Sequence, residues 1–177
     1  MSTRNVIAAT ALALAFGTGT AQAQSPGLGR PLSEADIKQW DIAILPDGTN
    51  LPPGSGTAAQ GATIFALKCA GCHGEGGKGG SSRALVGSPS LVAGGIEAEK
   101  MIANFWANST TLYDYIRRAM PWPQPRTLSN EEVYALCAYI LSLNKLIGDN
   151  DTMDAQTLPK VKMPNRDGFI SKYPEKH

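Results

Sequence analysis

The sequence predicts an all-α fold, and three observations support this prediction. No run of alternating apolar and polar residues is long enough for an ordinary strand. Ser129 and Glu132 form a capping box, which marks the start of a helix because the two side chains satisfy backbone amides that lack partners there. After this box Val133, Leu136 and Ile140 recur at helical spacing. The length of 177 residues favours a single domain.

The first 23 residues are predicted to be a secretory signal peptide. Arg4 precedes an apolar run from Val6 to Phe16, and Ala21-Gln22-Ala23 resembles a cleavage site. The run is shorter than the roughly 20 apolar residues of a transmembrane helix. We therefore expect a periplasmic protein whose mature chain has no membrane span, and an uncleaved N-terminal anchor is the alternative.

The charge balance of the mature chain gives no reason to expect nucleic-acid binding. Removing residues 1–23 takes away one of the 16 basic side chains and none of the 15 acidic ones. The remaining chain is formally neutral, whereas nucleic-acid binding usually requires a basic excess.

Residues 24–56 are predicted to form a Pro/Gly-rich N-terminal arm. Pro46-Asp47-Gly48 and the stretch from Leu51 to Gly56 are turn and breaker signals. Within the arm, residues 32–40 could form a short helix with Ser33 as its N-cap.

Residues 57–145 are predicted to form the helical domain, and residues 146–177 a polar C-terminal tail. Glycines make residues 74–95 mostly loop, and prolines interrupt residues 119–128. Before the final helix we expect helices at about Thr57–Leu67, Ile96–Trp106 and Thr110–Arg118, the last capped by Ser109 or Thr110.

Gly61 is expected to let the first and last helices of this domain approach closely. Phe65 and Tyr139 would then meet at the crossing.

The motif Cys69-Ala70-Gly71-Cys72-His73 predicts the covalent attachment of one haem c. Two thiols add across the haem vinyl groups, and the adjacent imidazole ligates the iron. A structural zinc site would need two more ligands, but the only others are Cys137 and the terminal His177. A redox dithiol would be expected at a βαβ turn, which the sequence lacks. Cys137 lies on the apolar stripe of the last helix and is predicted to be a buried, inert thiol.

Met120 is the predicted second axial ligand of the iron. Methionine is the usual partner of histidine in electron-transfer cytochromes. Met120 lies in a loop between two helices, where Pro121 and Pro123 stiffen the chain. Met101 is expected in a helix core, and Met163, in the tail, remains an alternative.

An iron with both axial positions filled is suited to electron transfer, so we predict no catalytic residues. A haem enzyme or gas sensor with an open iron position is the contrasting hypothesis.

Some further residues have two open interpretations. Trp122 could donate a hydrogen bond to a haem propionate or simply pack in its loop. Arg117, Arg118 and Arg126 could neutralise propionates, although solvent exposure is commoner for any one arginine.

The order of these features resembles that of class I cytochrome c over about residues 57–145. A first helix, C-x-x-C-H, a glycine-rich loop with Pro89, a Met-Pro loop and a capped last helix follow one another as in that family. The resemblance implies that Cys69 and Cys72 bind haem, and that His73 and Met120 are the axial ligands.

Most of the mature chain resembles the cytochrome subunit of bacterial sulfite (sulfur) dehydrogenases. The resemblance rests on these segments: Trp40-Asp41-Ile42, Pro46-Asp47-Gly48, Leu51 to Gly56, Gln60-Gly61, Phe105-Trp106, Thr111 to Pro121, Val133 to Leu136 and Lys162 to Phe169. It implies that this chain accepts electrons from a molybdopterin-containing subunit and passes them to a downstream cytochrome or terminal oxidase. The alternative is an independent periplasmic shuttle between another dehydrogenase and a terminal oxidase.

Overall fold

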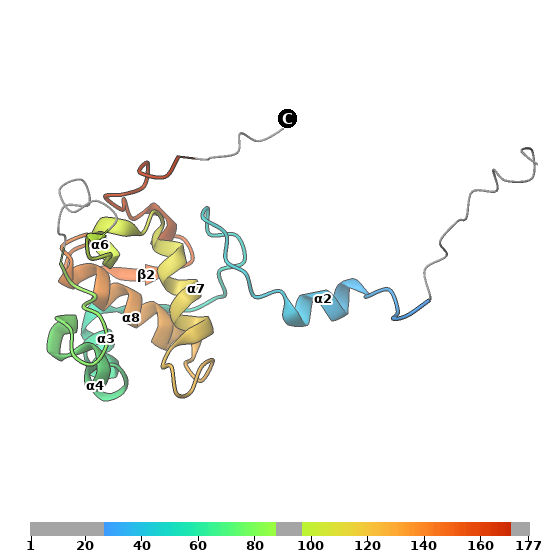
Figure 1. The fold of residues 1–177 in the computed structure, drawn as a ribbon, viewed down its shortest axis with the longest axis horizontal. Coiled ribbons are helices and arrows are strands. Elements are labelled where there is room, and N and C mark those ends of the chain that lie inside the picture. The colour runs from blue at the N-terminus through green and yellow to red at the C-terminus, as the bar shows by residue number, and fades with distance from the viewer. Residues whose placement is uncertain (1–26, 88–96, 171–177) are drawn as a thin grey trace, which may run out of the picture. The chain divides into compact units, whose positions relative to one another are not determined.

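The computed structural model describes residues 27–87 and 97–170, which belong to two compact units divided after Trp40 (Figure 1). The predicted signal peptide, Pro89 and His177 lie outside the described residues. In the described ranges, no helix is both long and apolar enough to cross a bilayer.

The first unit contains one short helix, α2 (Glu34–Trp40). Ser33 begins it as predicted, because its hydroxyl accepts a hydrogen bond from the Asp36 amide at 3.2 Å. In return the Asp36 carboxylate accepts the Ser33 amide at 3.0 Å. Arg30 pairs with the same carboxylate at 2.9 Å.

The second unit, Asp41–His177, confirms the all-α class and adds one very short antiparallel sheet. Its elements in chain order are β1 (Ser55–Thr57), α3 (Ala58–Lys68), α4 (Ala70–His73), the 3₁₀ turn η1 (Glu75–Gly77), α6 (Ile102–Phe105), α7 (Ser109–Ala119), α8 (Asn130–Leu143), β2 (Thr152–Asp154) and the 3₁₀ turn η3 (Leu158–Lys160).

The crossing of α3 and α8 is the centre of the fold, and Gly61 makes it possible as predicted. A Cβ atom on Gly61 would collide with the carbonyl oxygen of Ala135. Without that atom the helices approach closely, and the rings of Phe65 and Tyr139 meet with their centroids 5.4 Å apart.

Helix α8 is the most buried element of the core. The Ser129 and Glu132 capping box is present at its start, as predicted. Cys137 is fully buried, and burial raises the pKa of its thiol. The predicted burial of this thiol in the core is therefore confirmed.

The prediction of a helix over residues 96–106 is wrong over most of that range. Residue 96 lies outside the described residues, residues 98–101 are not helical, and α6 is a single turn. The Asn104 side chain accepts the Met101 amide at 2.7 Å and donates to the Glu99 carbonyl at 2.9 Å. These bonds satisfy backbone groups that a longer helix would have paired, and so they compete with it.

The predicted cap of α7 is also wrong by one or two residues. Asn108 occupies the N-cap position. Ser109 instead donates its hydroxyl hydrogen to the Leu158 carbonyl at 2.6 Å, in the C-terminal segment.

The segments on either side of the helical domain pack onto it. Strand β1 pairs antiparallel with β2, which puts Gly56 opposite Met153. The Tyr134 hydroxyl donates to the Pro52 carbonyl at 2.8 Å. Four apolar residues of the C-terminal segment are buried in the same core: Met153, Leu158, Val161 and Met163.

Candidate functional site

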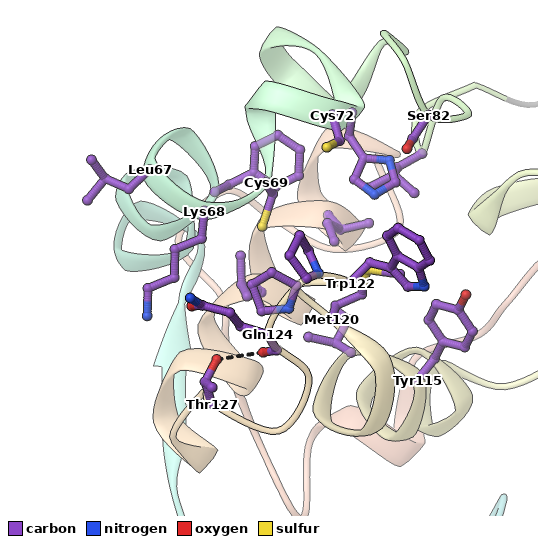
Figure 2. Close-up of a pocket in the computed structure, with 18 residues that line it drawn as sticks. Leu67, Lys68, Cys69, Cys72, Ser82, Tyr115, Met120, Trp122, Gln124 and Thr127 are labelled. Carbon is purple, nitrogen blue, oxygen red and sulfur yellow. Dashed lines mark hydrogen bonds between the residues drawn. The ribbon is translucent and has the colours of Figure 1, made fainter.

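A cavity of about 670 Å³ opens in the second unit, and all four predicted site residues line it (Figure 2). Cys69, Cys72 and His73 come from the end of α3 and from α4, and Met120 comes from the loop after α7. The volume lies within the range of about 300–1,000 Å³ that is usual for ligand and cofactor sites. Residues up to 51 positions apart in the sequence are thus gathered at one cavity.

The cysteines are presented by a break between two helices. Helix α3 ends at Lys68, and Cys69 is both its C-cap and the N-cap of α4. The Cys72 amide donates to the Cys69 carbonyl at 3.1 Å. Residues three apart in a helical turn lie on the same face, so both sulfurs can reach one partner.

The rival zinc and dithiol interpretations find no support among the described residues. Burial raises the pKa of the Cys69 thiol to about 11. Among the residues that the structure describes, no three side chains of His, Cys, Asp or Glu gather in a metal-binding group.

His73 is oriented by a backbone carbonyl that the sequence did not reveal. Its Nδ1 lies 2.9 Å from the carbonyl oxygen of Arg83. A carbonyl only accepts hydrogen bonds, so Nδ1 carries the hydrogen and Nε2 keeps the lone pair that an iron ligand needs. No side-chain pattern could have predicted this bond, because any residue at position 83 offers the same carbonyl.

The loop after α4 is held tightly against the motif. The Gly79 amide donates to the His73 carbonyl at 2.8 Å, and the Ser82 amide to the Cys72 carbonyl at 2.9 Å. Gly74 has φ of 74°, and a Cβ there would collide with the Gly79 backbone. This fold of the glycine-rich loop brings Arg83 to the imidazole.

Met120 is placed by the end of α7. Its amide still bonds to the Ile116 carbonyl at 3.0 Å, but its backbone is extended, with φ −117° and ψ 148°. A residue before proline avoids the helical region, so Pro121 ends the helix here.

A second cavity of about 220 Å³ adjoins the first, and His73 and Met120 line both. Met101 lines only the second cavity. Met153 and Met163 are 4% and 3% exposed, belong to the core, and line neither. Of the methionines in the described residues, Met120 is therefore the one that the structure brings together with His73 in both cavities.

The secondary candidates are distributed differently. Trp122 lines the first cavity and its side chain is 82% exposed (Figure 2). Arg117, Arg118 and Arg126 line neither cavity. Arg118 pairs with Asp114 at 2.8 Å instead.

The cavities fit a haem c attached through the motif. The walls are mainly apolar, as a flat macrocycle requires, with Phe65, Leu85, Ile116, Leu136 and Ile140 among the lining residues. Two thiols line the first cavity, and an imidazole and a thioether line both cavities.

Comparisons with known proteins agree with this geometry. A family model described as cytochrome c matches residues 58–144, a range that contains the four predicted site residues. A chain of the sulfane dehydrogenase SoxCD from Paracoccus pantotrophus, known from its crystal structure, is 38% identical to this chain with a TM-score of 0.73. The match covers 85% of this chain and 73% of that chain. The similarity therefore extends well beyond the range of the family model.

Proposed function

Because the chain belongs to the cytochrome c family, whose members bind haem c covalently, we propose that it carries one haem on Cys69 and Cys72 with His73 and Met120 as axial ligands. When bound, this group supplies a one-electron redox centre. The observation that carries the proposal is that His73 and Met120 both line both cavities. With haem bound, the imidazole oriented by Arg83 and the thioether at the end of α7 would occupy the positions where oxygen or peroxide could otherwise bind. Such a site transfers electrons and does not itself transform a substrate.

The electron donor that we propose is the molybdopterin subunit of a periplasmic sulfite (sulfur) dehydrogenase. Support comes from the 38% identity to a SoxCD chain, since that relative is part of a sulfane dehydrogenase. The segments outside residues 58–144 contribute to this similarity, because the match covers 85% of the chain. The electrons would then pass to a downstream cytochrome or terminal oxidase.

The stoichiometry of this reaction is fixed by its chemistry. Oxidation of sulfite to sulfate takes one oxygen atom from water and releases two protons, and its two electrons pass through the molybdenum subunit to the haem. A chain with one haem accepts one electron at a time, so each sulfite reduces two copies of this chain.

The proposal is tested by mixing the oxidised holoprotein with its cognate molybdenum subunit and sulfite. We expect rapid haem reduction that reaches two haems per sulfite. The control is the holoprotein with sulfite alone. If the molybdenum subunit turns over sulfite with an artificial acceptor but leaves this haem oxidised, the assignment of the partner is wrong.

The independent periplasmic shuttle remains the second candidate, and one observation favours it. Ile44 and Leu51 of residues 41–57 pack against the domain's own core, and the C-terminal segment buries Met153, Leu158, Val161 and Met163 in it. Their presence therefore does not require a partner. Full reduction by an unrelated respiratory dehydrogenase, together with no reduction by the molybdenum subunit, would identify the chain as such a shuttle.

A further inference from the structure

We propose that Asn144 is a positioning residue of the haem site, because it fixes the loop whose Arg83 carbonyl orients the imidazole of His73. Asn144 is the C-cap of α8, at the opposite end of that helix from the capping box. The inference rests on the proposed haem attachment with His73 as an axial ligand, but not on the identity of the electron donor. It gives a redox role to a side chain outside the described lining of both cavities.

The side-chain amide of Asn144 joins the end of α8 to the loop that follows α4. Its nitrogen donates to the Leu85 carbonyl at 3.1 Å and to the Ile140 carbonyl at 2.9 Å. Its oxygen accepts the Gly87 amide at 3.2 Å. The two carbonyls only accept and the Gly87 amide only donates, so these partners fix which end of the side chain is the nitrogen. Two of the three bonds reach residues 57 and 59 positions earlier in the sequence.

These bonds hold one side of the short segment that contains Arg83. On that side the Leu85 carbonyl is bound to Asn144. On the other side the Ser82 amide donates to the Cys72 carbonyl at 2.9 Å. Arg83 lies between the two attachments, so the direction of its carbonyl is fixed from both ends of the segment.

The bonds of Asn144 differ from the other bonds of this loop in what they connect. The Leu85 amide bonds to the Gly77 carbonyl at 2.8 Å, within the loop itself. The Ser82 amide bonds to the haem-attachment motif. Asn144 instead attaches the loop to α8, the most buried helix of the core. The orientation of the imidazole is thus set against the most rigid part of the fold.

The attachment matters for the iron because the Arg83 carbonyl tunes the ligand. The carbonyl oxygen lies 2.9 Å from His73 Nδ1, the distance of a well-formed hydrogen bond. Acceptance of this hydrogen makes the imidazole a more basic ligand, which favours ferric over ferrous iron. A loop released from α8 would keep this bond for a smaller part of the time, and the reduction potential of the haem would rise.

The experiment compares holoprotein variants at Asn144 with a matched change at the other end of α8. Asn144→Leu keeps the approximate volume of the side chain and removes all three bonds. Asn144→Ser keeps a hydroxyl that can bond to the Ile140 carbonyl one turn earlier, but it is one bond shorter and gives up the loop. Asn130→Leu is the control, because Asn130 lies on the same helix, donates to the Pro53 carbonyl at 3.4 Å and lines neither cavity.

The two readouts are the reduction potential and the solvent exchange of the His73 Nδ1 hydrogen, measured by NMR on the ferrous holoprotein. In both Asn144 variants we expect this exchange to become about tenfold faster, the effect of losing one or two ordinary hydrogen bonds. The potential should rise in both. Asn130→Leu should keep the wild-type exchange and potential, whatever its Tm. A role of Asn144 in stability alone would lower the Tm and leave both readouts unchanged.

Wild-type readouts in both Asn144 variants would overturn the proposal, and so would equal changes in Asn130→Leu. Wild-type readouts in Asn144→Ser alone would assign the effect to the end of α8 instead of the loop, and would overturn it as well. If neither variant matures, the wild-type holoprotein still decides. Its Gly87 amide must then exchange slowly, and rapid exchange there would show that Asn144 does not hold the loop.

This test is distinct from a failure of the proposed function. If the wild-type protein carries no covalent haem after expression with a maturation system, the proposed function is wrong. If it carries haem but is not reduced by the molybdenum subunit, only the donor is wrong and the Asn144 test still decides.

Discussion

Replacement of Glu132 by Gln should weaken the contact between α3 and α8 beside the haem-attachment motif. One carboxylate oxygen of Glu132 lies 2.6 Å from the Lys68 ammonium, at the end of α3. The other accepts the Ser129 amide at 2.9 Å and so closes the capping box of α8. A single side chain thus connects the residue before Cys69 to the start of the most buried helix.

The expected loss can be estimated from the exposure of the pair. The side chains of Lys68 and Glu132 are 38% and 29% exposed, so solvent screens their attraction, and such pairs contribute about 0.2–1 kcal/mol. The favourable position of a carboxylate in the first turn of a helix contributes about 0.3–1 kcal/mol more. Gln keeps an acceptor for the Ser129 amide, so Glu132→Gln should lower the free energy of unfolding by about 1 kcal/mol at pH 7. For a unit of this size that corresponds to a decrease in Tm of about 3–5 °C.

The same interactions set the pH dependence of this loss. The Lys68 ammonium, and then the Ser129 amide, hold the pKa of Glu132 below its ordinary value. The stabilisation is therefore complete above that ordinary value. It disappears as the pH falls through the lowered pKa of the folded state. The difference between wild type and variant should shrink in acid.

The assay is thermal and urea unfolding of the holoproteins between pH 3 and pH 7. Glu131→Gln is the matched control, because Glu131 is the exposed neighbour in the same helical turn. Lys68→Met and the double variant complete a mutant cycle that isolates the pair. The reasoning is refuted if Glu132→Gln and Glu131→Gln unfold alike at pH 7, or if the cycle shows no coupling.

Three further predictions follow from the site and the core. Met120→Leu should abolish the ferric Met–iron charge-transfer absorption and lower the reduction potential of the haem, because a thioether ligand raises that potential. The control Met101→Leu changes only the second cavity and should keep both the absorption and the potential. Gly61→Ala should cost about 2–3 kcal/mol in urea unfolding, because the new Cβ meets the α8 backbone; an unchanged midpoint would contradict the close crossing. Ser109→Ala should cost about 1–3 kcal/mol, because it leaves a buried carbonyl of η3 without its donor; the exposed Thr111→Ala should be nearly neutral.

The helices that the sequence predicted well are those with local signals at their ends. Helix α8 has a Ser-x-x-Glu box, and α3 begins where Thr57 and Gln60 form the same kind of cap. Such signals lie within four residues, so the sequence displays them directly. The predicted helix at 96–106 had no such signal, and the Asn104 side chain competes for the backbone there.

The same distinction, between what local sequence signals show and what depends on how the chain folds, applies to the candidate site. Covalent attachment and both axial ligands were predicted from side-chain chemistry at Cys69, Cys72, His73 and Met120, and these residues meet at one cavity. Two parts depend on how loops fold and were not predicted. The carbonyl that orients His73 belongs to Arg83, and neither cavity is lined by Arg117, Arg118 or Arg126, whose role the sequence left open. A loop can bring any backbone carbonyl to an imidazole, so residue type has no predictive value for that bond.

The folding unit is longer than the range that the cytochrome c family model matches. Residues 58–144 leave out β1 and β2, whose pairing places Met153 against the core, where it is 4% exposed. They also leave out Pro52, whose carbonyl accepts the hydroxyl of the buried Tyr134, and Leu158, which is fully buried. These groups pack against α7 and α8 through contacts between residues that are far apart in the sequence. The resemblance to a dehydrogenase subunit that extends past residues 58–144 is therefore explained in part by the core itself, since the flanking segments stabilise the domain that holds the haem site.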